Sequence, residues 1–534
     1  MHLIFSRHRP RLRLAGGVVA VIACAALAGA ALLLWPQVRL APSDAALARL
    51  VPPGFAGRIS AVQVGSPGDG ALPVALRDGQ LWPLRQLAPG ERLTVVVTVR
   101  RPGWAGWLVG HTQRRSLAVV APSAQLLGRW LQVQAGSPVT ASFAAPVEMI
   151  SLGGSPARAL PSPRAVVPLG VVARGTHSAG TVEVAAAARS WETLSAPVQV
   201  SWFPARSYPQ LLADPNPAAE LSPAGRLTLT FSEPIVDVLG SALPRVSPTT
   251  PGRWSKLDAH TLAFQPSGLG FGLGAVVQIE LPRGVHLAGQ PGATLTRTLR
   301  WQVPQGSTLR LQQLLARLGY LPLAWQGQMA EPTSLAGQLA AAVSPPAGQF
   351  SWRYPQLRNM LGSLWQPGQY SVLVRGAVMA FESDQGLASD GSAGPQVWAD
   401  LLRAAVHHQA DRQPYDYLEV SEAGSEALSV WRDGRIIYGT PCNTGIAAAP
   451  TAPGIYPIHA RYLSTTMSGT NPDGTPYHDP GIPYVTYFNG GDAVHGFRRA
   501  QYGFPQSLGC VELPYASAAV VFNYDPIGTL VGIS

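Results

Sequence analysis

Two reactive side chains near the C-terminal end of the chain, an imidazole and a thiol, have the types and spacing of a base and a nucleophile. His495 is followed by Gly496, and Cys510 follows Gly509 fifteen positions further on. A cysteine near its ordinary pKa is mostly protonated at neutral pH, so a nucleophilic thiol needs a neighbouring imidazole or cation. Gly509 also gives the backbone freedom to direct N–H groups at one point, as an oxyanion hole requires.

The same residues also fit a purely structural interpretation. Cys510 would then be a small buried hydrophobic residue, and His495 a core histidine with its hydrogen bonds satisfied. For an isolated cysteine and histidine this interpretation is the more common one. The surrounding sequence pattern decides between the two.

Four motifs in a fixed order surround the pair. They are Val430 to Gly445 (VWRDGRIIYGTPCNTG), Thr451 to Tyr456 (TAPGIY), His495-Gly496, and Ser507 to Val511 (SLGCV). Together they resemble the L,D-transpeptidase (YkuD-like) catalytic domain, over residues 415–534. Four motifs in the family's order favour the catalytic interpretation of the thiol and the imidazole.

Two positions depart from the family pattern. The family usually has a histidine directly before the Gly-Cys pair, where this chain has Leu508. It usually has arginine or asparagine two residues after the cysteine, where this chain has Glu512. Glu512 would face an amine, an amidated substrate or solvent. Both departures bear on the chemistry of the site more than on the fold.

The resemblance implies a mechanism. Cys510 attacks the carbonyl of the third residue, a diamino acid, in a peptidoglycan stem tetrapeptide and expels D-alanine. His495 serves as general base and acid, a carbonyl at Gly496 orients it, and the backbone N–H groups of Gly509 and Cys510 hold the oxyanion. An amine of a second stem then resolves the thioester into a 3-to-3 cross-link. No cofactor and no metal is implied.

The resemblance also implies contacts to the substrate. The residues expected to make them are Met467, Tyr484, Tyr487, Ser507 and Leu508. The segment from Arg461 to Asp492 is rich in aromatic residues among Gly, Asn and Pro, a composition suited to a mobile lid. For Tyr484 and Tyr487, simple packing within the domain is an equally good interpretation.

Three functions stay open at this point. A cell-wall transpeptidase is favoured by the intact set of His495, Ser507, Gly509 and Cys510. An L,D-carboxypeptidase would use water in place of the acceptor amine. A binding or scaffold protein with a decayed catalytic domain is favoured by Leu508.

Composition and charge set limits on the partners. The chain has 534 residues with 56 Gly and 50 Pro, and only 13% of its residues are charged, which suits many short strands and turns. Its formal net charge is +10, which fits an anionic partner such as an envelope polymer or a lipid surface. The sequence shows no nucleic-acid motif, and no nucleic-acid partner is expected.

The N-terminal region predicts a membrane anchor. A basic cytoplasmic segment, 1–13, precedes an uncharged apolar run over Leu14 to Trp35 that is long enough to cross a bilayer. The positive-inside rule then places the remaining chain outside the cytoplasm, at the cell envelope. A cleaved signal peptide, and lipidation at Cys24, are the alternatives.

Between the anchor and the catalytic domain the sequence predicts modules of two kinds. Alternating apolar residues punctuated by Gly and Pro indicate β-sandwiches. From Ser307 the period becomes helical, with Leu311, Leu314, Leu315 and Leu318 on one face. The expected parts are a linker at 36–54, β modules at 55–121 and 122–206, a module similar to bacterial Ig-like domains at 207–304, and at 305–410 a helical module that resembles peptidoglycan-binding domains.

The helical module carries an insertion at about 324–370. The alternative to a peptidoglycan-binding module is a helical spacer that binds no ligand.

The remaining cysteines and possible metal ligands add little chemistry. Cys24, Cys442 and Cys510 are the three cysteines of the chain, and they do not form a disulfide framework. Cys442 is expected to be structural or substrate-facing. His478 and Asp479 are adjacent but lack further ligands at zinc spacing, and we expect them in a loop.

Overall fold

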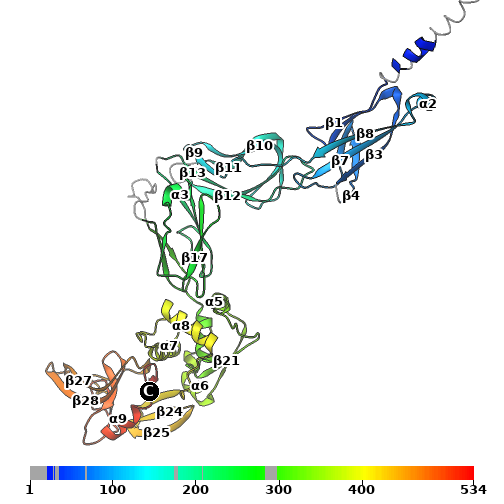
Figure 1. Cartoon of the computed structure of the whole chain (residues 1–534). Helices are drawn as coiled ribbons and strands as arrows, with labels where there is room; N and C mark the ends of the chain where they lie inside the picture. The colour runs from blue at the N-terminus through cyan, green and yellow to red at the C-terminus, as the bar shows by residue number, and fades with distance from the viewer. Residues whose placement is uncertain are drawn as a thin grey trace, which may run out of the picture. The chain divides into compact units, whose positions relative to one another are not determined.

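The structure is a computed structural model of the chain, and it describes residues 21–27, 29–30, 35–66, 69–172, 179–206, 208–282 and 298–534 (Figure 1). The chain divides into two compact units, with the boundary between Gln210 and Leu211. Strands form most of the regular structure, which confirms the predicted fold class of a mainly β, multidomain protein.

The predicted anchor, Leu14 to Trp35, lies largely outside the described residues. The described part of it includes a short helix over 21–27, in which Cys24 is exposed. Within the described ranges, no helix combines the length and the apolar character that a membrane span needs. The anchor therefore stays a prediction.

The first unit contains three antiparallel or mixed sheets, drawn in blue to cyan in Figure 1. Strand β7 has strictly alternating burial, which is the period-two pattern of a strand with one face in the core. The strands are β1 (Arg39–Pro42), β2 (Ala48–Val51), β3 (Arg58–Ser66), β4 (Asp69–Ala71), β5 (Val74–Arg77), β6 (Gln80–Pro83), β7 (Arg92–Arg100), β8 (Thr112–Val120), β9 (Trp130–Val133), β10 (Pro138–Leu152), β11 (Arg158–Val172), β12 (Gly180–Ala187) and β13 (Val198–Pro204).

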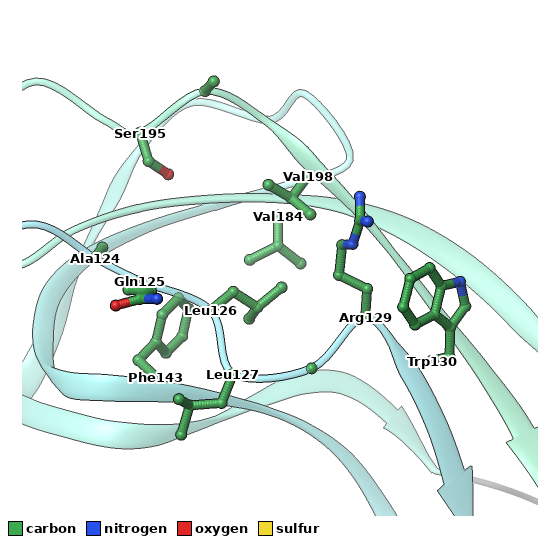
Figure 2. A pocket seen from close by; sticks show the side chains of 12 residues that line it. Ala124, Gln125, Leu126, Leu127, Arg129, Trp130, Phe143, Val184, Ser195 and Val198 are labelled. Atoms are coloured by element: carbon green, nitrogen blue, oxygen red, sulfur yellow. The ribbon is translucent and has the colours of Figure 1, made fainter. Parts of the chain in front are cut away.

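A cavity of about 600 Å³ lies in the sheet region of β9 to β13 (Figure 2). Aliphatic and aromatic side chains such as Leu126, Phe143 and Val184 line it, and the Arg129 guanidinium stands 4.7 Å from the centre of the Trp130 ring at its edge. Its lining contains no thiol, imidazole or carboxylate. Despite its size, this cavity therefore lacks the groups needed for the chemistry expected of the cysteine and histidine pair.

The second unit begins with two small sheets that share one apolar core. One sheet has the order β14-β15-β18-β17 and the other β16-β19-β20. The elements are β14 (Leu211–Asp214), β15 (Leu227–Phe231), α3 (Ile235–Leu239), β16 (Arg245–Ser247), β17 (Gly252–Lys256), β18 (Thr261–Pro266), β19 (Val276–Glu280) and β20 (Thr298–Gln302).

A helical region follows, and its apolar positions form one core. The leucines predicted on one helical face, Leu311, Leu314, Leu315 and Leu318, are all buried. The expected insertion contains a two-stranded sheet and two short helices of its own. The elements are α4 (Thr308–Arg317), β21 (Leu323–Gly327), α5 (Leu335–Val343), β22 (Gly348–Trp352), α6 (Pro355–Leu361), α7 (Val372–Asp384) and α8 (Pro395–His407).

The C-terminal region, orange to red in Figure 1, is built on two sheets. The first has the order β25-β24-β23-β31-β26, and the second β27-β28-β29-β30. The elements are β23 (Asp416–Ser421), β24 (Ala427–Arg432), β25 (Arg435–Pro441), β26 (Gly454–Pro457), β27 (Ala460–Thr470), β28 (Pro476–Asn489), β29 (Asp492–Gly496), β30 (Val511–Leu513), α9 (Tyr515–Val521) and β31 (Leu530–Ile533).

Two hairpins of this region compare directly with the sequence. The predicted hairpin through Asp433 and Gly434 joins β24 to β25, and both turn residues have positive φ, at 50° and 76°. The segment expected to be a lid, Arg461 to Asp492, is mostly the regular antiparallel hairpin of β27 and β28. His478 and Asp479 therefore lie in a strand, and the expectation of a loop was wrong because these positions pair with β27.

The helical region packs tightly on the first sheet of the C-terminal region. A Cβ on Gly376 of α7 would come within 2.7 Å of the Gly528 carbonyl oxygen, and a Cβ on Gly528 within 2.4 Å of the Gly376 oxygen. Tyr417 and Leu530 of the sheet belong to the same apolar core as the helices. Paired glycines let the backbones approach closely, so α7 covers one side of the C-terminal region.

Candidate active site

The second sheet brings the two reactive side chains together. His495 lies in β29, and Cys510 directly precedes β30. These strands pair in parallel, with Val494 opposite Val511 and His495 opposite Glu512. Because parallel strands need a long connection, residues 497–510 loop out and return beside the histidine.

Both residues line a cavity of about 450 Å³. Of the predicted substrate contacts, Met467, Ser507 and Leu508 also line it. The remaining lining residues are Asn471, Tyr477, Asp479, Ile482, Gly491, Asp492, Phe497, Arg499, Gln506 and Glu512.

The two predicted tyrosine contacts do not line this cavity. Tyr487 packs in the small apolar cluster that Cys510 borders. Tyr484 packs against Phe522, with 5.6 Å between ring centres, beside the core of the domain. For Tyr484 this contact favours the packing interpretation, and its contact with a substrate stays a prediction.

His495 is a buried and oriented base. Only 3% of its surface is exposed, and its Nδ1 lies 3.1 Å from the Gly496 carbonyl oxygen. A carbonyl can only accept a hydrogen bond, so Nδ1 carries the proton and Nε2 keeps its lone pair. Burial lowers the pKa of the imidazole, and the hydrogen bond to Gly496 opposes this shift. The ring is therefore neutral and basic at neutral pH.

Gly496 itself is required by crowding. A Cβ at this position would meet the Tyr515 ring at 3.0 Å and Pro483 at 3.1 Å. Helix α9 and strand β28 close over the backbone here, which holds the orienting carbonyl in place.

The surroundings of Cys510 favour the protonated form of its thiol. Burial raises its pKa to about 12, the backbone N–H of Ala493 lowers it, and the nearby carboxylates of Asp492 and Glu512 raise it again. Its Sγ lies 3.9 Å from the Gly491 carbonyl oxygen. The resting pair is thus a neutral thiol and a neutral imidazole, and the proton must leave the sulfur as the thiol attacks.

The glycine before the thiol has a conformation that few other residues adopt. Its φ is +113°, and a Cβ would stand 2.4 Å from Asp492 Oδ1. The Gly509 N–H donates to Ser507 Oγ at 3.2 Å, and the Ser507 hydroxyl donates to the Cys510 carbonyl oxygen. The Gly509 N–H expected in the oxyanion hole is therefore occupied within the loop by Ser507.

Two motifs noted in the sequence hold this loop. Thr451 Oγ1 donates to the Gly509 carbonyl oxygen at 2.9 Å and accepts from the Gly445 N–H at 2.8 Å. The backbone of Asn443 exchanges two hydrogen bonds with that of Glu512, at 3.0 and 2.9 Å. The CNTG and TAPG motifs thus act on the site through the backbone on both sides of the cysteine.

Glu512 does not face an amine, an amidated substrate or solvent, as the sequence had suggested. It is 4% exposed, and both of its carboxylate oxygens accept hydrogen bonds from Arg499 at 2.7 Å. Sequence reasoning missed Arg499, Asp479 and Asp492. The sequence offered only their positions as a signal: Arg499 lies four residues after His495, and the two aspartates lie in the segment expected to form the lid. Position along the chain does not show which side chains face the thiol.

Cys442 is fully buried in the core of the domain and is a free thiol, so it is structural and does not face a substrate. Burial raises its pKa to about 12. It provides an internal control for the reactivity of Cys510.

Comparisons with known proteins identify the domain that contains the cavity. Residues 415–533 match the family model of YkuD, the L,D-transpeptidase catalytic domain. The catalytic domain of an E. faecium L,D-transpeptidase is 25% identical, over 23% of this chain and 100% of that one, with a TM-score of 0.21. An L,D-transpeptidase from Mycobacterium smegmatis is 12% identical, over 61% of this chain and 100% of that one, with a TM-score of 0.21. No curated protein matches the chain.

We predict that Gly509→Ala slows acylation of Cys510 by a carbapenem by about 10-fold or more. The new Cβ would strain the backbone by about 1–3 kcal/mol and displace Asp492. Gly474→Ala is the matched control, because Gly474 also has positive φ but has open space around its Cβ. The measurement is the rate of adduct formation by intact mass. Equal rates in both variants would contradict the role of this conformation.

We also predict a steep pH dependence of thiol alkylation. With a pKa of about 12, the thiolate fraction of Cys510 is small at pH 8 and rises about tenfold per pH unit. Iodoacetamide should therefore react with Cys510 at least about 100-fold more slowly at pH 8 than with the same cysteine in the unfolded chain, because the thiolate fraction falls by more than about 1,000-fold and the higher nucleophilicity of a high-pKa thiolate offsets only part of that fall. Cys442, being buried, should stay unmodified in the folded protein. Peptide mass mapping measures this, and a plateau of Cys510 alkylation below pH 9 would show a preformed thiolate instead.

Proposed function

From the L,D-transpeptidase catalytic domain that residues 415–533 form, we propose that this protein cross-links peptidoglycan stem peptides through a thioester on Cys510. The observation that carries the proposal is the cavity lined by both Cys510 and His495, with Nδ1 of the histidine held by the Gly496 carbonyl. A base with one nitrogen fixed in this way presents the other nitrogen for proton transfer.

In the first half of the reaction, Nε2 of His495 takes the thiol proton as Sγ of Cys510 attacks the carbonyl of the third stem residue. The Cys510 N–H is the backbone donor that we assign to the oxyanion. Loss of one such donor costs about 3–4 kcal/mol in other enzymes. The intermediate collapses to a thioester, and the leaving amine of D-alanine takes the proton from His495.

In the second half, the amine of another stem attacks the thioester. His495 accepts a proton from this amine and returns it to the sulfur as the C–S bond breaks. The product is a peptide bond between two third-position residues, which is a 3-to-3 cross-link. If water attacks instead, the product is a shortened stem, and the enzyme is a carboxypeptidase.

The Leu508 side chain can neither transfer a proton nor form a hydrogen bond, and it lines the cavity as an apolar group. The base that we assign is His495, so the absence of an imidazole at position 508 leaves the proton path complete. This favours an active enzyme over a decayed scaffold.

We further propose that the protein works at the outer face of the cytoplasmic membrane. Support comes from the arginine-flanked apolar run over Leu14 to Trp35, which would keep the catalytic domain outside. The β modules would act as spacers and the helical module would contact peptidoglycan. Protease digestion of spheroplasts should remove residues beyond Trp35, and a soluble mature protein that starts after the apolar run would contradict the anchor.

The proposal predicts that Cys510→Ala and His495→Ala abolish both D-alanine release and cross-linked dimer formation from stem tetrapeptides. Loss of the base alone should cost about 10²- to 10⁴-fold. Cys442→Ala is the matched control, since it removes a thiol from the same domain but outside the cavity. Mass spectrometry of the products separates dimers from shortened stems, and thermal unfolding checks that each variant is folded.

Two outcomes would contradict this mechanism. Undiminished product formation by Cys510→Ala would exclude the thioester. A wild-type enzyme that gains no carbapenem adduct on Cys510 and forms no product would favour the scaffold alternative.

A further inference from the structure

An ion pair at the edge of the catalytic cavity joins the loop before Cys510 to the strand after it. Arg499 Nε donates to Glu512 Oε2 and Arg499 Nη2 to Glu512 Oε1, both at 2.7 Å. The Glu512 side chain is 5% exposed and that of Arg499 30% exposed. Bidentate geometry of this kind is strong and directional. Glu512 therefore acts as a buried anchor that fixes the plane of a partly exposed guanidinium.

This guanidinium is placed close to the reacting groups. The parallel register sets Glu512 directly opposite His495, on the same face of the sheet. The Phe497 ring is near both Arg499 and His495: its centre is 4.7 Å from Cζ of Arg499 and 6.0 Å from the His495 ring centre. Arg499 also lines the cavity that holds Cys510.

Part of the hydrogen-bonding capacity of Arg499 stays available to a ligand. A guanidinium has five N–H donors. Nε and Nη2 serve Glu512, and Nη2 also donates to the Gln506 carbonyl oxygen at 3.1 Å. Within the described residues Nη1 has no hydrogen-bond partner on the protein. Glu512 occupies the Nε–Nη2 edge and Gln506 takes the second N–H of Nη2, so the two N–H groups of Nη1 are left for a second carboxylate.

The other charged groups of the cavity have the opposite sign. Asp479 and Asp492 line it as well, and both are carboxylates. Among the lining residues, all of them in the described part of the chain, Arg499 carries the one permanent positive charge. Glu512 is a third carboxylate in the lining, and it is paired with Arg499. Arg499 is therefore the lining group whose permanent charge and remaining donors can attract a substrate carboxylate.

We infer that Arg499, held in place by Glu512, binds a carboxylate of the donor stem peptide and makes the enzyme select stems in which that group is free. The inference rests on the proposed function for the identity of the substrate. Two carboxylates of a stem tetrapeptide fit: the terminal carboxylate of D-alanine, and the free carboxylate on the side chain of a diaminodicarboxylic acid at the third position. Arginine suits this task because its five N–H donors let one guanidinium hold Glu512 and still offer the N–H groups of Nη1 to a ligand.

Binding and turnover are measured separately to test the inference. Four synthetic stems are compared: the free acid, the terminal amide, the side-chain amide and the double amide. Binding is measured by calorimetry on full-length protein with Cys510→Ala, which cannot turn the stems over. Turnover is measured on the wild-type thiol as D-alanine release.

Amidation of the recognised carboxylate should weaken binding by about 10- to 100-fold, as expected for loss of a charge-assisted hydrogen bond. The amide that causes this loss identifies which carboxylate Arg499 binds. The double variant Arg499→Met with Glu512→Gln, which leaves no unpaired buried charge, should bind the acid and its amide equally. Arg499→Lys should keep part of the preference, and Glu512→Gln alone should keep most of it.

A purely structural ion pair gives a different pattern. The double variant would then weaken all four stems equally and retain the preference for the free acid, which would overturn the inference. Equal binding of all four stems by the Cys510→Ala protein that keeps Arg499 and Glu512 would also overturn the inference. A clear preference in binding without any product from the wild-type enzyme would leave the role of Arg499 standing and count against the proposed function.

Discussion

The parallel pairing of β29 with β30 is the constraint on which the site depends. It places His495 opposite Glu512 and starts the second strand one residue after Cys510. A parallel connection is usually made by a helix, but here a loop spans the distance. The loop consequently needs its own supports, and it obtains them from the Arg499 pair, from Thr451 and from the backbone of Asn443.

Burial sets the electrostatic character of the catalytic pair. It lowers the pKa of His495 and raises that of Cys510, and the carboxylates of Asp492 and Glu512 further favour the protonated thiol. Many reactive cysteines are activated by a preformed ion pair with an imidazolium. Here burial favours the neutral form of both partners, and the hydrogen bond to the Gly496 carbonyl, not a charge pair, orients the imidazole.

Close backbone approach explains several glycines around the catalytic domain. Gly376 and Gly528 allow α7 to lie directly on the turn before β31, and Gly496 allows α9 to lie on the end of β29. The helical region and the catalytic sheet also share an apolar core. The face of the catalytic domain under α7 is thus closed by packing, while the Cys510 cavity is lined by β27, β28, β29 and the loop before β30.

The sequence by itself determined the reactive pair, the hairpin at Asp433-Gly434, the mainly β fold class and the family of residues 415–533. These depend on local signals: residue types at short spacing, turn residues with positive φ, and period-two or helical alternation. Leu311 and its neighbours were found in the same way, because the spacing of apolar residues along the chain predicts which face of a helix is buried.

Only the tertiary structure decided which side chains surround the thiol. Tyr484 and Tyr487 look equivalent in sequence, but the first packs against Phe522 and the second against the small apolar cluster that Cys510 also borders. Glu512 looks like a lost substrate contact, whereas the fold pairs it with Arg499, thirteen residues earlier in the chain. The physical reason is that strand register and loop closure decide the direction in which a side chain points. The residue types next to it in the chain predict neither the register nor the path of the loop.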